Sequence, residues 1–435
     1  MRQGARNVRI NFTASSLTHF GGVYLLHQFL QQIQFRSFLA RTIQFPQRNH
    51  RYTISELVIA HLYPMILGLE KIEVSALLKT NGTFQYLTGL PDFPHPTTLR
   101  RFLVRGAAGG LLPQFRDAHD RLRRHFLGLP AIPSSFWLNC DSTVKTLYGH
   151  QEGAEKGYNP EHRGKRSYHP LLVTEAHRGD SLAGMLRPGN ASSADGISAL
   201  IERVYAVLPH HVRLRLRADA GFYDKKFIEL LREKGISFAI VARLTQRLKS
   251  RVAGLHYHKI SDRFSVADFR YQPFGWKQKE RFVVLRRTVP DDPEEQLTLF
   301  TLARHAYSAI VTDIALQPYQ VFQFYNDRAA LERIIRILKD DYPFGSAPTN
   351  FFEANALYAE LSLLAYDLMI WFKRLCLPED WQSFTLPTIR HRLLMIPGAF
   401  VKSRNIPTLR FPKNCLYQDV FYSAQTRIKK LDPLI

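Results

Sequence analysis

Residues 325–339 read YNDRAALERIIRILK, and this spacing predicts one amphipathic helix. The apolar positions of the stretch recur at i, i+3, i+4 and i+7, which gives one buried stripe; they are Leu331, Ile334, Ile335 and Leu338. Glu332 and Lys339 fall within roughly 20° of the same side of such a helix, next to the stripe. The stretch therefore sets one carboxylate among cations on an anchored helix.

A solvated helix face is the alternative interpretation of the same stretch. Arg328 and Glu332 stand four residues apart, and a surface ion pair at this spacing contributes only about 0.3–0.5 kcal/mol. The choice between the two interpretations depends on residues upstream.

Composition narrows the class of protein. The chain has 435 residues, 45% of them hydrophobic and 12% aromatic, enough for large cores and about two to four domains. Its 59 Lys and Arg against 37 Asp and Glu give a formal net charge of +22, so the surface attracts polyanions. Nucleic acid is the leading partner, although ribosomal, membrane-surface and merely soluble basic proteins share this balance.

Other features exclude several classes of site and location. The three cysteines have no paired spacing, and His150, His162 and His169 fit no zinc pattern, so we expect neither a disulfide framework nor a zinc site. No apolar signal-peptide core follows the first residues, so export is not expected. The most apolar run, 356–372, carries Glu360 and Asp367, which favours a buried helix in a soluble protein over a membrane span.

The pattern of predicted helices and strands divides the chain into five segments. Residues 1–130 read as helical, with Thr53 and Glu56 spaced as a capping box. Strands alternate with helices over 131–244, and a β-rich segment that looks like an insertion covers 245–317. Residues 318–375 are again predicted to be helical, and a basic region follows at 376–435. This alternation predicts a mixed α/β core.

A short basic helix is expected near the end of the first segment. Thr97 or Thr98 can cap it, and Arg100 and Arg101 lie on it. Such a helix could enter a DNA groove; the alternative is a surface helix that links two packed helices.

Two predicted strands each end in an acid. The apolar run that begins at Ser135 ends at Asp141, and the strand over 212–218 is followed by Asp219. A sheet brings neighbouring strand ends together, and the helix with Glu332 can pack across them. Three carboxylates would then offer Mg²⁺ the hard oxygen donors that it prefers. Each acid alone is more typical of a turn or a helix cap.

At these residues the chain resembles the bacterial insertion-sequence transposases of the DDE class, whose catalytic core is similar to ribonuclease H. The resemblance is carried by the motifs Asn139-Cys-Asp141-Ser-Thr and Asp219-Ala-Gly-Phe-Tyr223, and by the segment from Gly157 to Pro170. It also includes the signature of Tyr, two residues, Arg, three residues, Glu, six residues and Lys, matched at Tyr325, Arg328, Glu332 and Lys339. The likeness covers about 135–345.

The resemblance implies a metal-dependent mechanism on DNA. It implies that Asp141, Asp219 and Glu332 bind two Mg²⁺ ions, for which Mn²⁺ can substitute. It also implies DNA contacts by Tyr325, Arg328 and Lys339, and the segment that follows the first acid adds Lys165 and Arg166 as candidates. Arg supplies a bidentate fork for phosphate, whereas Lys supplies a point charge.

Trp276 lies in the β-rich segment, which corresponds to the β insertion of that family. In some relatives an aromatic residue there stacks on a flipped base, and Trp276 is the candidate for that role. The favoured alternative is an aromatic at a hairpin turn that packs on its own insertion.

The function expected from this resemblance is that of a transposase. It would bind the terminal inverted repeats of its element, cut DNA with Mg²⁺ and join the 3′ ends to target DNA, as a homodimer in the synaptic complex. It would be a cytoplasmic, nucleoid-associated bacterial protein without a membrane partner. The alternatives are a domesticated, non-catalytic DNA-binding protein and a metal-dependent nuclease without strand transfer.

Overall fold

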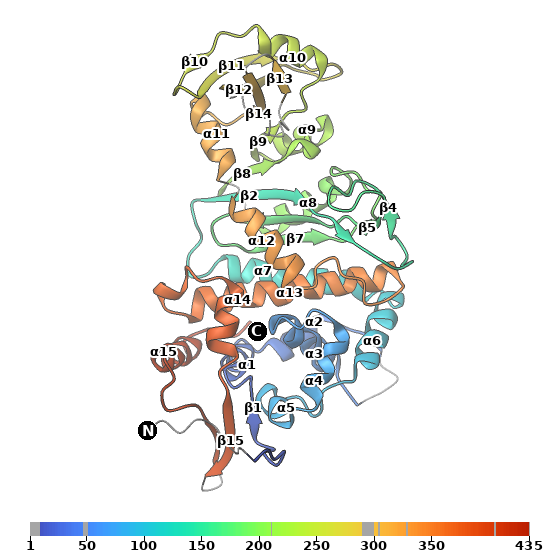
Figure 1. Cartoon of the computed structure of the whole chain (residues 1–435), viewed down its shortest axis with the longest axis vertical. Coiled ribbons are helices and arrows are strands. Elements are labelled where there is room, and N and C mark those ends of the chain that lie inside the picture. Colours follow the sequence, from blue (N-terminus) through green and yellow to red (C-terminus); the bar gives the residue numbers. More distant parts are fainter. Residues whose placement is uncertain are drawn as a thin grey trace. The chain divides into compact units, whose positions relative to one another are not determined.

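The computed structural model describes residues 9–46, 51–209, 211–288, 300–302, 305–327, 329–403 and 406–434 (Figure 1). Two compact units divide the chain. Unit 1 comprises Met1–Phe102 and Trp371–Ile435, and unit 2 comprises Leu103–Ile370. The first and last parts of the sequence therefore fold together.

Unit 1 is mainly helical. Its elements are α1 (Val23–Gln32), α2 (Phe35–Thr42), α3 (Ile54–Ile66), η1 (Ile72–Ser75), α4 (Ala76–Lys79), α5 (Gly82–Thr88), η3 (Glu379–Trp381), α14 (Leu386–Ile389), η4 (Arg390–Leu394) and α15 (Gln418–Ile428). A small sheet has the order β1 (Leu17–Thr18), β15 (Gly398–Ser403), β16 (Ile406–Arg410). The capping box predicted at the start of α3 is confirmed: the Thr53 side chain accepts from the Glu56 N–H, and Glu56 accepts from the Thr53 N–H.

The basic helix α6 (Pro96–Ala108) begins in unit 1, earlier than predicted. Neither Thr97 nor Thr98 caps it, so that expectation is wrong. The ring Nδ1 of His95 accepts from the Thr97 N–H at 3.3 Å, and Pro96 occupies the first turn, where its missing N–H costs nothing.

A large mixed sheet forms the centre of unit 2, which confirms the expectation of a mixed α/β protein. Its strands follow the order β10-β11-β12-β14-β9-β8-β2-β6-β7, with β13 on β14. The bounds are β2 (Ser135–Ser142), β6 (Leu171–Glu175), β7 (Ser181–Met185), β8 (Arg213–Ala218), β9 (Ser237–Val241), β10 (His258–Lys259), β11 (Phe264–Tyr271), β12 (Glu280–Thr288), β13 (Phe300–Leu302) and β14 (His305–Thr312). Strand β8 pairs in parallel with both β2 and β9, and the β-rich segment joins this sheet because β14 pairs with β9.

Helices and a small sheet complete unit 2. The helices are α7 (Leu111–Leu127), α8 (Ile197–Val207), η2 (Ala220–Phe222), α9 (Lys225–Glu233), α10 (Gln246–Ala253), α11 (Pro318–Asn326), α12 (Ala329–Asp340) and α13 (Phe352–Cys376), which extends into unit 1. The small sheet has the order β3 (Lys145–Thr146), β5 (Arg166–Tyr168), β4 (Glu155–Lys156).

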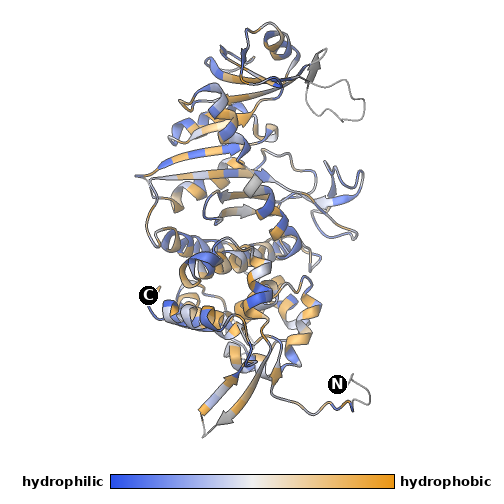
Figure 2. Cartoon of the chain, turned by 60° about the vertical axis from the view of Figure 1, so that its left-hand side comes forward, coloured by the Kyte–Doolittle hydropathy of each residue, from blue (hydrophilic) through white to orange (hydrophobic). Residues whose placement is uncertain are grey.

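The two faces of the central strands bury different sets of side chains. Leu138 and Cys140 of β2 belong to the larger core cluster, whereas Trp137 packs on a second cluster that includes Phe324 of α11. Because side chains alternate along a strand, Asn139 and Asp141 share the face of Trp137. Hydrophobic and hydrophilic residues lie side by side along these strands (Figure 2).

The stretch 325–339 forms two helices, so the prediction of one helix is wrong. Helix α11 ends at Asn326, where the Asp327 N–H bonds to the Gln323 carbonyl, and α12 starts at Ala329. Asn and Asp favour helix ends because their short side chains compete for backbone hydrogen bonds. Tyr325 therefore lies in the last turn of one helix, and Glu332 lies in the first turn of the next, where a negative charge complements the helix dipole.

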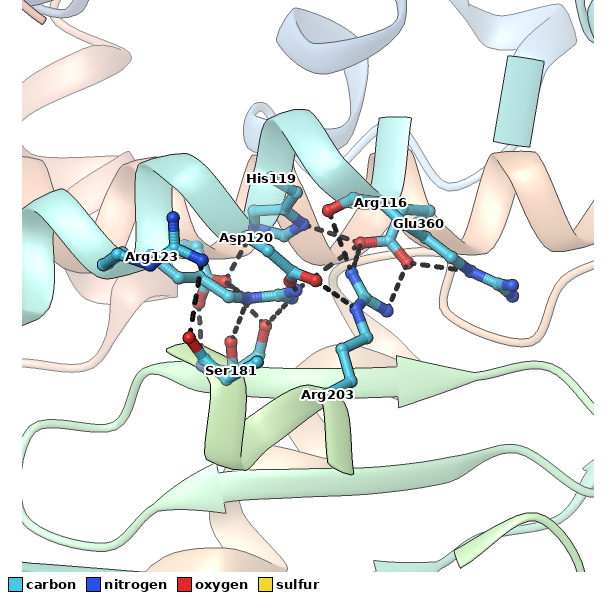
Figure 3. A network of polar contacts seen from close by, with 10 residues as sticks. Arg116, His119, Asp120, Arg123, Ser181, Arg203 and Glu360 are labelled. Carbon is cyan, nitrogen blue, oxygen red and sulfur yellow. Dashed lines mark hydrogen bonds and ion pairs between the residues drawn. The ribbon is translucent and has the colours of Figure 1, made fainter. Parts of the chain in front are cut away.

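A buried polar network joins α7, α8, α13 and β7 within unit 2 (Figure 3). The ring of His119 lies between two carboxylates, with Nδ1 2.8 Å from Glu360 and Nε2 2.9 Å from Asp367. Arg203 donates to Asp120 at 2.5 Å and to Glu360 at 3.1 Å, so both acids of the apolar run 356–372 are paired inside the protein.

None of the helices in the described part of the chain combines the length and apolar character needed to cross a bilayer.

Candidate active site

Asp141 and Asp219 lie at neighbouring strand ends. Strands β2 and β8 run parallel, with Cys140 opposite Ala218, so the next residue on each strand is one of the two acids. Neighbouring strands are about 5 Å apart, which brings the two backbones close together. Both acids are half-buried, so their carboxylates remain within reach of solvent.

Local hydrogen bonds orient these two carboxylates. Asp141 accepts from the Ser142 N–H at 2.8 Å, and Asp219 accepts from the Gly221 N–H at 2.8 Å as it caps η2. A Cβ at Gly221 would lie 2.6 Å from the Cβ of Ser193, so only glycine fits this turn. The Ser193 hydroxyl is also 3.4 Å from the Ser142 hydroxyl, so the segment around Ser193 contacts the surroundings of both acids.

Arg187 holds the segment that contacts both acids. It is 3% exposed and donates to the carbonyls of Ser192, Ser193 and Asp195 at 2.6–3.1 Å. Burial lowers the pKa of Arg187 to about 10, so it remains charged at neutral pH. Burial also lowers the pKa of His169, whose carbonyl accepts from Arg187, and this favours a neutral ring near Asp219.

Asp141 and Glu332 line one cavity of about 560 Å³, although 191 positions separate them in the sequence. Its charged lining consists of four carboxylates and three cations: Asp141, Glu161, Glu332 and Asp340 with Lys145, Arg336 and Lys339. The formal charge of this lining is −1. A polyanion would therefore meet no net attraction there unless divalent cations were bound.

The structure brings two of the three predicted ligands to this cavity and the third beside it. Asp219 is adjacent to Asp141 but does not line the cavity. Among the residues that the structure describes, no group of three or more His, Cys, Asp or Glu side chains is close enough to hold a metal ion. The donor set nevertheless suits Mg²⁺, which usually binds one or two carboxylates, several waters and substrate phosphate.

Two cations of the cavity were not identified from the sequence. Lys145 donates to the Lys339 carbonyl at 3.0 Å and so joins β3 to the end of α12. Arg336 is exposed and follows Glu332 by four residues. Helical spacing could have identified Arg336, because i and i+4 share one side of a helix, whereas the position of Lys145 depends on the sheet.

The remaining residues of the predicted signature differ in their surroundings. Lys339 is half-buried, with its ammonium 3.8 Å from Glu161. Tyr325 is half-buried against the cluster under α11, and Arg328 lies outside the described residues. Of the two described residues, Lys339 lines the cavity and Tyr325 does not.

The segment after Asp141 places basic and aromatic side chains at the surface. Lys165 is exposed, while Arg166 on β5 donates to the Ala154 carbonyl at 3.1 Å. Tyr148, 82% exposed, and His162 line the cavity with Asp141 and were not among the predicted site residues. This segment thus forms one wall of the candidate site.

Trp276 is half-buried and belongs to a cluster that includes residues of its own β-rich segment, and its ring also stacks on Tyr223, which lies outside that segment. The two rings stack with centroids 5.3 Å apart and planes 30° apart. Tyr223 ends the motif that begins at Asp219, so the turn at Trp276 is tied to the core. At the same turn Phe274 is 88% exposed, which makes it the more accessible aromatic.

Arg100 and Arg101 lie on α6 in unit 1. Arg100 forms an ion pair with Glu73, whereas Arg101 is exposed. Only Arg101 of this pair therefore presents its charge fully to solvent.

Comparison with known proteins places the chain in a family. No curated protein matches it. Among the solved structures that match, the piggyBac transposase synaptic complex with hairpin DNA is similar with a TM-score of 0.45 and 9% sequence identity, over 87% of this chain and 80% of that chain. The model of the family described as transposase DDE domain group 1 matches residues 2–433. Because this match spans nearly every residue, the chain belongs to the transposase DDE domain family, group 1.

Proposed function

We propose that the protein is a DNA transposase that cleaves DNA at the ends of its element and joins the 3′ ends to target DNA. One observation carries this proposal: Asp141 and Glu332 line a single cavity with Lys145, Arg336 and Lys339, beside Asp219, in a chain of the transposase DDE family. In this proposal Asp141, Asp219 and Glu332 are the metal ligands.

Divalent metal ions, Mg²⁺ in this proposal, would activate the attacking oxygen and stabilise the leaving 3′ oxygen when bound. The protein's own groups bind and orient the DNA. Two divalent ions change the formal charge of the lining from −1 to +3, which favours phosphate entry. Arg336 and Lys339 would then hold the phosphates on either side of the scissile bond, with Tyr325 and Arg328 as further DNA contacts.

The domain roles also belong to this proposal. The mixed sheet with acids at adjacent strand ends is compatible with a ribonuclease H-like core formed by 131–244 and 318–375, interrupted by the β-rich segment 245–317. The helical region 1–130, with Arg101, and the basic region 376–435 would contribute DNA binding. A bacterial insertion-sequence origin and a place at the nucleoid follow from the same interpretation.

Cleavage of a labelled duplex that carries the element's ends tests the proposal. Wild-type protein with Mg²⁺ should cut the duplex and join it to a second DNA. Asp141→Asn, Asp219→Asn and Glu332→Gln should each abolish cutting while end binding remains. Asp224→Asn is the matched control, because Asp224 caps α9 five residues after Asp219 and does not line the cavity.

The same assay separates the rival functions. Binding without cutting by wild-type protein would support a domesticated DNA-binding protein. Cutting without joining would support a nuclease. Near-normal cutting by Glu332→Gln would refute the ligand assignment.

Assembly provides a second test. One three-carboxylate site per chain handles one end at a time, so coordinated insertion of two ends requires at least two chains, most simply related by a two-fold axis. Light scattering with and without end DNA should show a homodimer in the complex. A synaptic complex with one chain and two ends would refute it.

A further inference from the structure

Arg217 is a buried arginine in the middle of the main sheet. It lies on β8, between β2 and β9, and is 1% exposed. Buried arginines are rare because desolvating the charge is costly unless the guanidinium is well bonded. The position therefore requires specific partners.

The contacts of Arg217 reach two other segments of unit 2. Its Nε donates to the Asn139 side-chain oxygen at 2.8 Å, and its Nη1 donates to the Phe324 carbonyl at 2.6 Å. The guanidinium also lies over the rings of Trp137 and Phe324, 5.5 and 5.2 Å from their centroids. One side chain thus joins β2, β8 and α11.

Each of these three segments leads directly to a proposed metal ligand. Asn139 precedes Asp141 by two residues, and Arg217 precedes Asp219 by two. Residues i and i+2 of a strand share one face, so the side-chain bond between Asn139 and Arg217 lies one step beneath the two acids, on the same face. The pair therefore fixes the register of the two strand ends that carry the acids.

The third contact of Arg217, its hydrogen bond to the Phe324 carbonyl, lies at the end of α11. Phe324 lies in the last turn of α11, whose final carbonyls lack partners within the helix, and a cation there also complements the helix dipole. Arg217 thus caps α11 at the point from which the chain turns into α12, and Glu332 follows eight residues after Phe324.

We propose that Arg217 is a positioning residue that holds β2, β8 and α11, the three segments that lead to the acids, in one geometry. The inference rests on the proposed function for the roles of Asp141, Asp219 and Glu332. Groups that orient metal ligands without touching the metal typically change metal affinity or activity 10- to 100-fold when removed.

The test compares three variants of the full chain. Arg217→Met removes both hydrogen bonds but retains an unbranched side chain. Arg217→Lys keeps the charge but lacks the rigid fork that reaches two acceptors. Arg215→Met is the matched control, because Arg215 lies on the same strand with its guanidinium 5.8 Å from the Trp137 ring and forms no hydrogen bond to Asn139 or Phe324.

Amide hydrogen exchange provides a readout that does not depend on activity. In the protein without DNA, Arg217→Met should raise exchange about tenfold in peptides covering 136–142 and 318–326, Arg217→Lys should raise it less, and Arg215→Met should leave it unchanged. Unchanged exchange at 318–326 in Arg217→Met would overturn the inference. If Arg217→Met fails to fold, Arg217→Lys answers the same question.

DNA binding and single-turnover cleavage then test whether the positioning role of Arg217 affects the cleavage reaction. Arg217→Met should bind end DNA within about threefold of wild type, cut it 10- to 100-fold more slowly, and need more Mg²⁺ for half-maximal rate. An equal loss in Arg215→Met, or a normal rate despite faster exchange, would overturn the link to the acids. If wild-type protein cuts no DNA, the proposed function fails, and the exchange result still decides whether Arg217 holds the segments.

Discussion

Unit 2 contains two groups of carboxylates with opposite surroundings. Glu360, Asp367 and Asp120 are held in the buried network by His119, Arg123 and Arg203. The acids of the candidate site, by contrast, are half-buried or exposed, and two of them line an open cavity. Within the described part of the chain, neither Asp219 nor Glu332 forms an ion pair.

This difference separates carboxylates that support the fold from carboxylates that are available to a ligand. Burial alone would raise the pKa of Glu360, but Arg203, His119 and Arg123 together hold it well below its usual range. A carboxylate held in this way cannot bind a metal without breaking a buried pair. The site acids lie where metal and phosphate can reach them, which is the arrangement that the proposed chemistry requires.

The largest expected effect is a loss of DNA cleavage without a loss of protein stability. Asp219→Asn should lower the cleavage rate at least 10³-fold, roughly 4 kcal/mol of transition-state stabilisation, because a metal ligand is lost. The thermal midpoint should stay within about 2 °C of wild type or rise, because a half-exposed negative charge beside other acids is removed. Cleavage kinetics and calorimetry on the same preparation measure the cleavage rate and the thermal midpoint. A large loss of stability would show that Asp219 supports the fold, as the buried carboxylates do.

His119→Leu should have the reverse effect. It removes the ring that bonds to both Glu360 and Asp367 and leaves each of these buried carboxylates with one hydrogen-bond partner fewer, which should cost about 3–5 kcal/mol of unfolding free energy. Urea denaturation followed by far-ultraviolet circular dichroism measures this loss. His125→Leu, on the last turn of the same helix, is the control, and equal losses in the two variants would contradict the role assigned to the network.

Acid should affect the network through Glu360. Because the folded-state pKa of Glu360 is depressed below 4.5, its contribution to stability is fully present above pH 4.5 and is lost as the pH falls through the lower folded value. One such group changes the unfolding free energy by at most about 1.4 kcal/mol per pH unit. Denaturation midpoints of wild type and Glu360→Gln between pH 6 and 3 should show a shallower decline in the variant, and parallel declines would refute this.

The smallest effect concerns a single cation of the cavity. Arg336→Ala should weaken end binding by less than about 1 kcal/mol at moderate salt and reduce the slope of log K against log salt by about one. Arg333→Ala is the matched control, because Arg333 is exposed on the same helix but does not line the cavity. Fluorescence anisotropy across a salt series measures the slopes of both variants. If the two slopes are identical, Arg336 is an ordinary solvated surface residue without a DNA contact of its own.

The sequence by itself determined the local features of this protein. A short apolar run predicted the strand that ends near Asp141, alternating apolar residues predicted the strand before Asp219, and the spacing of Thr53 and Glu56 predicted the cap of α3, because these depend only on neighbours along the chain. The resemblance to the DDE transposases was also drawn from sequence alone, and the match of the chain to the DDE domain family agrees with it. The sequence alone did not show which acids lie next to each other, because the order of strands in a sheet is not a local property.

Only the tertiary structure decided how distant residues meet. The register of β2 against β8 puts Asp141 next to Asp219, and the packing of α12 brings Glu332 to the cavity that Asp141 lines. The sequence predicted one continuous helix over 325–339 because its apolar period continues across the break after Asn326, and the period does not record where a helix end is capped. Arg217 resembled any other arginine on an alternating strand, and its role follows from burial and hydrogen bonds that form only when three separate segments pack together.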